Sequence, residues 1–364
     1  MKRILFIAHH LNRAGTEAFM MNVFRGIDHS RFRVDFLLYN NCVTDYTREV
    51  EENGSHIWRV PCRRESPWGW YSSLCKFFRE HVSEYFAVHY CGNSLTAIFP
   101  LVLAYKYRIP VRIAHSHNSS SKGFHNRFLH IFKREIVKHI TTHHFACSTL
   151  AARWFFGNAP VTIIQNGINT MDFAYNPSVR REMRLQLGIR DTTKVVGHVG
   201  RFEIEKNHTF MLDVFTEYLE IQPDSVLMFI GIGCLFESMK EKVLQIGLAD
   251  KVLFLGERSD VNKLMQAMDV FLMPSTFEGQ PFVLIEAQCS GLPCLVSDVI
   301  NRDICLTPNV DTFPLQQPAE EWARKVKTIV TGFHRKDESE AIERQGYSIA
   351  NTIKFLEQVY DGQL

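Results

Sequence analysis

The sequence predicts an α/β protein of two doubly wound domains, each with a parallel sheet covered by helices. The chain has 364 residues, 46% hydrophobic and 22% charged, which is too long for one ordinary core and typical of a globular protein. Short apolar segments rich in β-branched and aromatic residues alternate with helical segments. This alternation starts at residue 2 and restarts near residue 194, so we expect two wound domains.

The first half begins with a strand, a loop and a helix, which together open a βαβ unit. Residues 2–8 have the composition of a buried strand, and a helix is expected over 15–25. Further strands are predicted at 32–38, 57–60, 86–90, 111–115, 144–147 and 161–164, with helices over 74–83 and 124–138 among them. This half should form a parallel sheet with helices on both faces.

The second half follows a polar stretch that ends in an Arg-rich helix over 179–187, which we interpret as an interdomain linker. Strands are predicted at 194–200, 225–231, 252–255, 270–273 and 293–297, with helices over 208–220, 237–246, 261–268, 282–288 and 342–360. The expected domains are 1–172 and 173–340, followed by a terminal segment, 341–364. In such folds a ligand binds in the crevice at the carboxyl ends of the strands.

Two glutamates eight residues apart, Glu278 and Glu286, carry the strongest chemical signal. Glu278 lies in a predicted loop, and Glu286 lies in the helix that follows. Two carboxylates beside a helix N-terminus can accept several hydroxyl groups while backbone N–H groups bind an anion, as a nucleotide-sugar site requires. Two solvated glutamates would be the plain alternative, but the apolar flanks on both sides favour a functional role.

The segment resembles the Glu-x7-Glu motif of the family 4 retaining glycosyltransferases, which have the GT-B fold of two Rossmann-like domains facing across a cleft. The resemblance implies that Glu278 contacts the donor sugar and stabilises an oxocarbenium-like transition state, while Glu286 holds the ribose hydroxyls. It also implies that the first domain binds the acceptor, the second binds the nucleotide sugar, and the C-terminal helix crosses back to the first. The residues between the glutamates that it places at the donor are Gly279, Gln280, Pro281 and Phe282.

Two cations, Arg201 and Lys206, follow the predicted strand at 194–200 and bracket a loop that ends at a helix start. A fixed Arg and Lys can stabilise a leaving diphosphate without a metal ion, although a solvated loop pair would look the same. The pattern resembles the Gly-Arg-x4-Lys element of the same family, in which the two cations hold the donor diphosphate.

Weaker signals complete the predicted donor site. Gly15 and Thr16 stand at the first strand-to-helix turn, where a glycine allows close approach of a phosphate or sugar, although family members usually carry a second glycine where this chain has Ala14. Arg258, after the strand at 252–255, matches the family position that contacts the base.

A histidine is expected near the reaction centre at the end of the strand over 111–115. His115 and His117 share one face by the two-residue period of a strand, so either or both can face the cleft. A structural histidine is equally compatible with this pattern. The resemblance favours His117 as the residue that touches the donor sugar and the reacting atoms.

No cofactor or metal site is predicted. The nine cysteines include no Cys-x-x-Cys pair, and adjacent histidines such as His9 and His10 point in different directions on a regular element. We therefore expect a metal-independent enzyme whose nucleotide sugar is a substrate. Nothing in the pattern of basic and aromatic residues predicts a nucleic-acid partner.

Contact with an anionic membrane is a further hypothesis. Residues 1–172 hold 21 Lys and Arg against 12 Asp and Glu, and the segment 119–139 interleaves basic residues with apolar ones at helical spacing. The alternative is a helix docked on the sheet by its apolar stripe. Because no run approaches the roughly 20 apolar residues that span a bilayer, we expect a cytoplasmic protein, with peripheral contact at the inner face of the cell membrane as the hypothesis.

Together these features predict transfer of a hexosyl unit from a nucleotide diphosphate sugar, most simply a UDP-sugar, to a saccharide or lipid-linked saccharide in surface polysaccharide synthesis. Two alternatives remain at this point. One is a GT-B-fold hydrolysing epimerase of sugar nucleotides, and the other is a non-catalytic subunit that binds nucleotide sugars.

Overall fold

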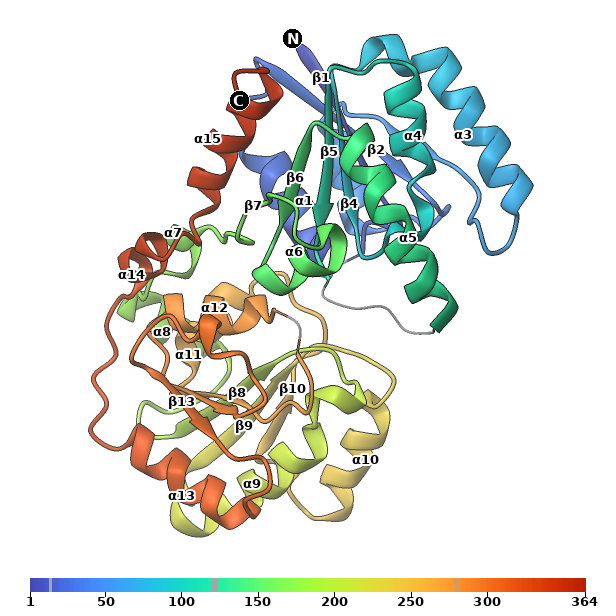
Figure 1. Ribbon diagram of the computed structural model, residues 1–364. Helices are drawn as coiled ribbons and strands as arrows, with labels where there is room; N and C mark the ends of the chain where they lie inside the picture. Colours follow the sequence, from blue (N-terminus) through green and yellow to red (C-terminus); the bar gives the residue numbers. More distant parts are fainter. Residues whose placement is uncertain (13–14, 119–123, 279) are drawn as a thin grey trace. The chain divides into compact units, whose positions relative to one another are not determined.

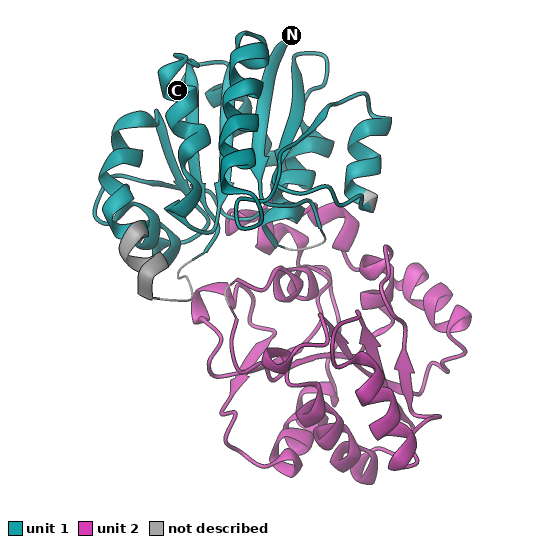
Figure 2. Cartoon of the chain, turned by 90° about the vertical axis from the view of Figure 1, so that its right-hand side faces the viewer, with its two compact units in different colours: residues 1–167, 349–364 teal, residues 168–348 magenta. Residues whose placement is uncertain are grey.

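The computed structural model describes residues 1–12, 15–118, 124–278 and 280–364, leaving aside the side chains of 45 and 124–129. The chain forms two compact units (Figures 1 and 2). Unit 1 comprises Met1–Gly167 and Ile349–Leu364, and unit 2 comprises Ile168–Ser348. Each unit contains one sheet in which every pairing is parallel, as predicted.

The sheet of unit 1 has the order β3-β2-β1-β4-β5-β6-β7. Its strands are β1 (Lys2–Ala8), β2 (Phe32–Leu38), β3 (Ile57–Arg59), β4 (Ala87–Gly92), β5 (Val111–Ser116), β6 (His143–Ala146) and β7 (Thr162–Ile163). The chain winds outward from β1 in one direction and from β4 in the other, so these two strands flank the topological switch point.

Helices cover both faces of this sheet. They are α1 (Gly15–Gly26), α2 (Asp45–Glu52), α3 (Pro67–His81), α4 (Phe99–Lys106), α5 (Phe124–Ile140), α6 (Thr149–Phe156) and α15 (Ile349–Tyr360), with short 3-10 turns η1 (Val82–Glu84) and η2 (Leu95–Ala97). Ile4 and Phe6 of β1 pack in one buried cluster with α1 and α15, whereas Leu5 and Ile7 pack in another with α3 and α4. Because both faces are buried, the strand is apolar throughout rather than alternating.

The sheet of unit 2 has the order β10-β9-β8-β11-β12-β13. Its strands are β8 (Lys194–Val199), β9 (Ser225–Ile230), β10 (Val252–Phe254), β11 (Val270–Met273), β12 (Cys294–Ser297) and β13 (Val310–Phe313). Here the winding reverses between β8 and β11, which are neighbours in the sheet. Their carboxyl ends therefore define the switch point of this unit.

The helices of unit 2 also lie on both faces of its sheet (Figure 1). They are α7 (Thr170–Phe173), α8 (Pro177–Gln186), α9 (His208–Ile221), α10 (Phe236–Gln245), α11 (Val261–Ala267), α12 (Phe282–Cys289), α13 (Ala319–Val330) and α14 (Ser339–Arg344), with 3-10 turns η3 (Ile204–Lys206) and η4 (Arg302–Ile304).

Two predictions about the chain's course are wrong. The Arg-rich helix expected in a linker is α8, and it belongs to unit 2: Arg184 is buried, and its guanidinium lies 3.2 Å from a carboxylate oxygen of Asp269. The single helix expected over 342–360 is two helices, because Gly346 adopts a left-handed conformation with φ of 88° that ends α14.

The units also divide at slightly different residues from those expected. The first crossing lies after Gly167 rather than after residue 172, and the second lies before Ile349 rather than at 341. The backbone N–H of Ile168 donates to the carbonyl of Tyr347, which joins the two ends of unit 2. In unit 1, Leu356 and Tyr360 of α15 are buried in the same cluster as β1.

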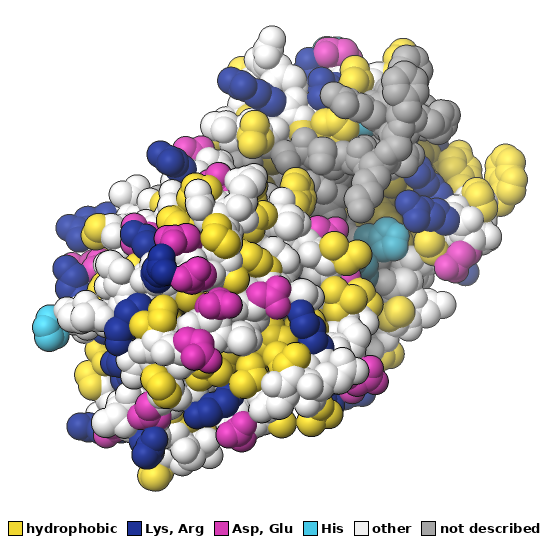
Figure 3. Space-filling view, turned by 90° about the horizontal axis from the view of Figure 1, so that it is seen from below, with side chains coloured by type: hydrophobic (Ala, Val, Ile, Leu, Met, Phe, Trp, Pro, Cys, Tyr) yellow, Lys and Arg dark blue, Asp and Glu magenta, His cyan; other side chains and the backbone are white. Residues whose placement is uncertain are grey.

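Charged side chains of both signs are mixed over the face seen in Figure 3, where Lys and Arg lie among Asp and Glu. In unit 2, for example, Arg190 is 2.9 Å from Asp224, and Lys242 is 3.2 Å from Asp213. Such pairs neutralise one another locally. Among the helices of the described chain, none is both long and apolar enough to cross a membrane.

Candidate active site

The loop after β8 is held against the loop after β9 by backbone hydrogen bonds. The N–H of Gly200 donates to Ile230 at 2.9 Å, and the N–H of Phe202 donates to Ile232 at 3.0 Å. Arg201 lies between these two anchored residues, and its side chain is exposed. The guanidinium therefore projects from a fixed backbone at the carboxyl end of the sheet.

Two glycines after β9 make this close approach of the loops sterically allowed. A methyl group on Gly231 would lie 2.1 Å from the carbonyl oxygen of Gly200, and one on Gly233 would lie 2.6 Å from the backbone nitrogen of Phe202. Gly231 also has a φ of 132°. The sequence analysis missed both residues, although a Gly-x-Gly pattern directly after a strand is a readable signal.

Lys206 and Glu278 form an ion pair at the switch point of unit 2. The ammonium of Lys206, in the turn after β8, lies 2.6 Å from a carboxylate oxygen of Glu278, in the loop after β11. Both side chains are largely buried. The structure thus brings two of the predicted residues into contact where a wound sheet binds its ligand.

Buried serines support the carboxylate of Glu278 from behind. Ser275 donates its hydroxyl to the same oxygen of Glu278 at 2.7 Å. Ser297, at the end of β12, donates in turn to the carbonyl of Ser275 at 2.6 Å, and both serines are buried. Asn207 holds the same loop from the other side, since its amide donates to the carbonyl of Pro274 at 3.1 Å. Glu278 is therefore positioned from three strands.

Glu286 has a different environment. It lies on α12 and is half-buried, and among the described residues no hydrogen bond or ion pair to its side chain is present. Burial raises the pKa of Glu286 to about 7. One glutamate of the motif is thus paired with a cation, whereas the other is desolvated and unpaired.

The remaining donor-site candidates of unit 2 occupy the same edge of the sheet. Gln280 and Pro281 precede α12 and Phe282 begins it, while Gly279 lies outside the described residues. Among the described residues no side chain caps this helix, which leaves the N–H groups of Phe282 and Val283 available to an anion. Arg258 is held by Asp260 through two hydrogen bonds of 2.8 and 2.7 Å. Its loop adjoins the β9 loop, where Gly231 donates to the carbonyl of Gly256 at 2.8 Å.

In unit 1 the two candidate histidines have distinct positions. His115 is completely buried within the sheet, whereas His117 lies just beyond β5 and is half-buried. Their ring centroids are 4.1 Å apart, and the His117 ring also contacts that of Phe19 at 5.1 Å. Burial lowers the pKa of His117 to about 3. Both rings are therefore neutral at physiological pH, and only His117 lies near the surface.

The turn after β1 leads into α1, whose first turn carries a buried carboxylate, Glu17, in unit 1. Gly15 and Thr16 begin α1, and Ala14 lies outside the described residues. Glu17 is buried, and its carboxylate lies 3.0 Å from Nδ1 of His10. The sequence analysis did not identify this pair.

The sequence is similar to those of several known proteins. The family described as glycosyl transferases group 1 matches residues 179–348. EpsF of Bacillus subtilis (strain 168), a protein named provisionally as a glycosyltransferase, is 33% identical over 99% of this chain and 96% of its own. The UDP-Gal:alpha-D-GlcNAc-diphosphoundecaprenol alpha-1,3-galactosyltransferase of Escherichia coli is 34% identical over 41% of this chain and 39% of its own.

Solved structures agree on the fold. Anabaena HepE in complex with UDP superposes with a TM-score of 0.78 at 18% identity, covering 100% of both chains. A glycosyltransferase from Rickettsia africae superposes with a TM-score of 0.77 at 14% identity, covering 99% of this chain and 98% of that one. Both are similar to this chain in fold.

Proposed function

This chain belongs to the glycosyl transferases group 1 and is a glycosyltransferase, and from that premise we propose that it transfers a hexosyl unit from a UDP-sugar to a saccharide or lipid-linked saccharide in surface polysaccharide synthesis. The ion pair of Lys206 with Glu278 at the switch point carries the proposal. The name of the Escherichia coli relative, which gives a UDP-linked donor and a diphosphoundecaprenol acceptor, supports the choice of both substrates.

The proposed roles follow from charge and position. Arg201 and Lys206 receive the diphosphate, whose negative charge grows as the bond between the sugar and the phosphate breaks. The ammonium of Lys206 has three donors, so it can keep its contact with Glu278 while it binds a phosphate oxygen. The carboxylate of Glu278 then lies beside the positive charge that develops on the sugar, and Glu286 accepts hydrogen bonds from the ribose.

The backbone at the start of α12 supplies further contacts. The backbone N–H groups of Phe282 and Val283 suit the second phosphate, and Arg258 suits the base. In unit 1, the role proposed for His117 is contact with the donor sugar, and Gly15 and Thr16 allow the donor to approach α1 closely.

The proposed reaction retains the configuration of the sugar. The bond between C1 and the phosphate oxygen breaks, and the acceptor oxygen bonds to C1 on the same face. The acceptor proton passes to the leaving phosphate oxygen, so no separate protein base is required. Because two fixed cations stabilise the leaving group, we propose that no divalent metal takes part.

A contact with the membrane is proposed on α5. Phe132 is 70% exposed, and its neighbours Ile131 and Ile136 are 48% and 39% exposed. The residues of α5 that face the sheet are instead Val137 and Ile140, both buried. The exposure of Phe132 and Ile136 argues against the alternative in which these two residues dock on the sheet. The predicted apolar stripe also includes Phe124, Phe128 and Leu129, whose side chains lie outside the described part of the structure.

The basic side chains of α5 are less available to a membrane surface than the sequence suggests, because each already has a partner within the protein. Lys133 donates to the carbonyl of Thr96 at 2.8 Å, Arg134 donates to that of Trp154 at 2.9 Å, and Lys138 is paired with Glu135. Their charges remain near the exposed apolar residues, so an anionic lipid surface matches the chemistry of this face.

A screen of nucleotides and nucleotide sugars tests the proposal. Binding of UDP, GDP and their sugars is measured by calorimetry, and transfer is measured by product mass with saccharide and polyprenyl-diphosphate acceptors. We expect UDP-sugar binding and a product heavier by one hexosyl unit. Release or epimerisation of the sugar without transfer would support the epimerase, and binding without any turnover would support the non-catalytic subunit.

A further inference from the structure

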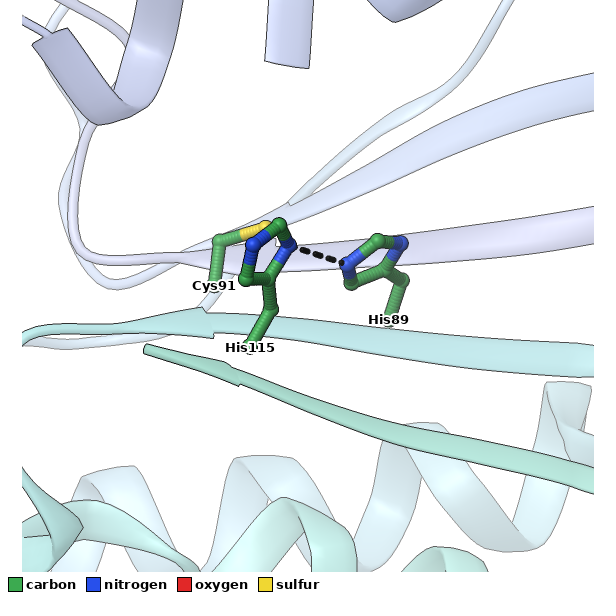
Figure 4. A group of neighbouring side chains, drawn as sticks. All are labelled: His89, Cys91 and His115. Carbon is green, nitrogen blue, oxygen red and sulfur yellow. Dashed lines mark hydrogen bonds between the residues drawn. The ribbon is translucent and has the colours of Figure 1, made fainter. Parts of the chain in front are cut away.

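Three buried side chains that play no part in the proposed reaction gather inside unit 1 (Figure 4). Cys91 of β4 is the register partner of His115 on β5, and His89 precedes Cys91 by two residues on the same face of the sheet. Both imidazoles are completely buried. One ligand atom of each residue lies within 4.8 Å of the others, so the cluster has the composition of a metal site.

The hydrogen bonds of His89 favour a different interpretation. Its Nδ1 lies 2.7 Å from the hydroxyl of Tyr360, and its Nε2 lies 3.1 Å from Nδ1 of His115. Both ring nitrogens of His89 are therefore already in use, and a cation would have to displace one of these bonds. The cluster is thus a hydrogen-bonded chain that runs from Tyr360 through His89 to His115.

Counting donors and acceptors gives the direction of this chain. If Tyr360 donates to Nδ1 of His89, then His89 donates from Nε2 to His115, and only the Nε2–H of His115 lacks a partner. If the chain runs the other way, both the hydroxyl hydrogen of Tyr360 and the Nε2 lone pair of His115 lack one. Nε2 of His115 has no partner within the described residues in either case. Because an unmet buried polar group is costly, the first direction, which leaves fewer such groups, is favoured.

The hydrogen-bonded chain ends at His115, whose ring contacts that of His117, the histidine proposed to touch the donor sugar. The ring of His115 lies 4.1 Å from that of His117, and Phe19 packs against both rings at 5.0 and 5.1 Å. Any change in the tautomer or tilt of His115 therefore changes the surface on which His117 rests. Tyr360 is 271 residues from His89 in sequence and comes from the last helix of the chain.

We infer that Tyr360, acting through His89, is a positioning residue that fixes the tautomer and orientation of His115 and thereby places His117 for transfer. The inference rests on the proposed function for the role of His117. The tautomers of His89 and His115 do not depend on that role, which allows the two to be tested separately.

The test compares Tyr360→Phe, which removes only the hydroxyl, with Tyr39→Phe as a matched control. Tyr39 is also buried in unit 1, and its hydroxyl has no hydrogen-bond partner within the described residues. Nitrogen-15 NMR of labelled histidines reports the tautomers, with His89→Gln and His115→Gln used for assignment. In the wild type and the control, both rings should carry the hydrogen on Nε2.

In Tyr360→Phe the two directions of the chain become equivalent, since each leaves two groups unmet. We expect mixed tautomers for His89 and His115, a kcat about tenfold lower and an unchanged affinity for UDP, because misplaced reacting groups lower turnover more than ground-state binding. Unchanged tautomers, or an unchanged kcat in a folded Tyr360→Phe protein, would overturn the inference. So would one equivalent of tightly bound zinc or copper in purified protein that is lost on Cys91→Ser. The tautomer result stands even if no transfer is found.

Discussion

The carboxylate of Glu278 accepts hydrogen bonds from Lys206 and Ser275 before any substrate arrives. A carboxylate held in this way cannot turn to follow a substrate, so its negative charge has a fixed direction. A fixed charge stabilises a developing positive charge without reorganisation, which is the main way in which such sites lower a barrier.

Replacing Glu278 with Gln tests this role of charge. The side chain keeps its size but loses the charge, so transfer should fall by about 10²- to 10³-fold, a typical loss for one preorganised electrostatic group. The affinity for UDP should change little, because UDP lacks the sugar. Initial rates and calorimetry measure the two effects, and Glu237→Gln on α10 serves as an exposed control. A Glu278→Gln protein with the wild-type rate would remove Glu278 from the mechanism.

Removing the charge of Glu286 should stabilise the fold but weaken the binding of UDP. Its folded pKa of about 7 lies above the unfolded value of about 4.3, so burial of this carboxyl destabilises the protein progressively as pH rises from about 4.3 to about 7. Glu286→Gln should therefore raise the Tm at pH 8 but not at pH 4, while it weakens UDP binding by about 1–3 kcal/mol. Thermal unfolding across pH and calorimetry at pH 8 check both parts. Equal Tm differences at the two pH values would refute the assignment.

The sequence named both glutamates but could not distinguish their environments. Lys206 reaches Glu278, and Ser297 reaches Ser275, only because β8, β11 and β12 are neighbours in the folded sheet. The same reason explains the histidines: a period of two places His115 and His117 on one face, but only the fold shows that His115 lies inside the sheet.

At the scale of elements, the loops after β8 and β9 form one unit because two glycines allow their backbones to touch. Gly231→Ala tests this contact against Gly247→Ala. Both glycines have positive φ, but a methyl group would meet the Gly200 carbonyl only at Gly231. Gly247→Ala should cost about 1–2 kcal/mol from the backbone alone.

Gly231→Ala should cost more than the control in urea unfolding, and it should lower the affinity for UDP at least tenfold by moving Arg201. This follows because the added methyl group must displace the backbone of Gly200, next to Arg201. Equal losses of stability in the two variants, with UDP binding intact, would show that the loop contact has no bearing on the site.

The exposed apolar residues of α5 predict that the protein binds vesicles containing anionic lipid. Phe132→Glu should reduce flotation with vesicles that contain anionic lipid, and Leu244→Glu, at a residue of unit 2 that is 66% exposed, should not. Changing Lys133, Arg134 and Lys138 to Glu should reduce binding further and lower its sensitivity to salt. If none of these changes affects vesicle binding, α5 has a packing role alone.

The predicted elements were most accurate where apolar periodicity is strong. The strands from β8 to β11 and the helices between them follow the prediction closely. The sequence analysis missed α13 and β13. The strand Val310–Phe313 has only four residues and none is fully buried, so it carries little apolar signal. The helix Ala319–Val330 is strongly amphipathic, with Trp322, Ala323 and Val326 buried at helical spacing, so its periodicity was a readable signal that was overlooked.

In the molecule as a whole, the six strands of unit 2 follow the same order as the first six strands of unit 1, and the switch point of each sheet could not be predicted from the order of the elements in the sequence. In unit 2, residues 72 positions apart meet as Lys206 and Glu278. In unit 1, α15 from the chain's end completes the core around β1. Composition and periodicity predicted the two wound sheets, whereas the order of strands within each sheet is a property of tertiary packing.

In the proposed mechanism, transfer at the Lys206–Glu278 centre retains the configuration of the sugar and needs no metal ion. Proton NMR of the anomeric signal of the product, formed from an α-linked UDP-sugar in the presence of EDTA, tests both features together. We expect an α-linked product at the rate seen without EDTA, because Arg201 and Lys206 neutralise the leaving diphosphate. A β-linked product, or activity that disappears in EDTA and returns with Mg²⁺ or Mn²⁺, would contradict it.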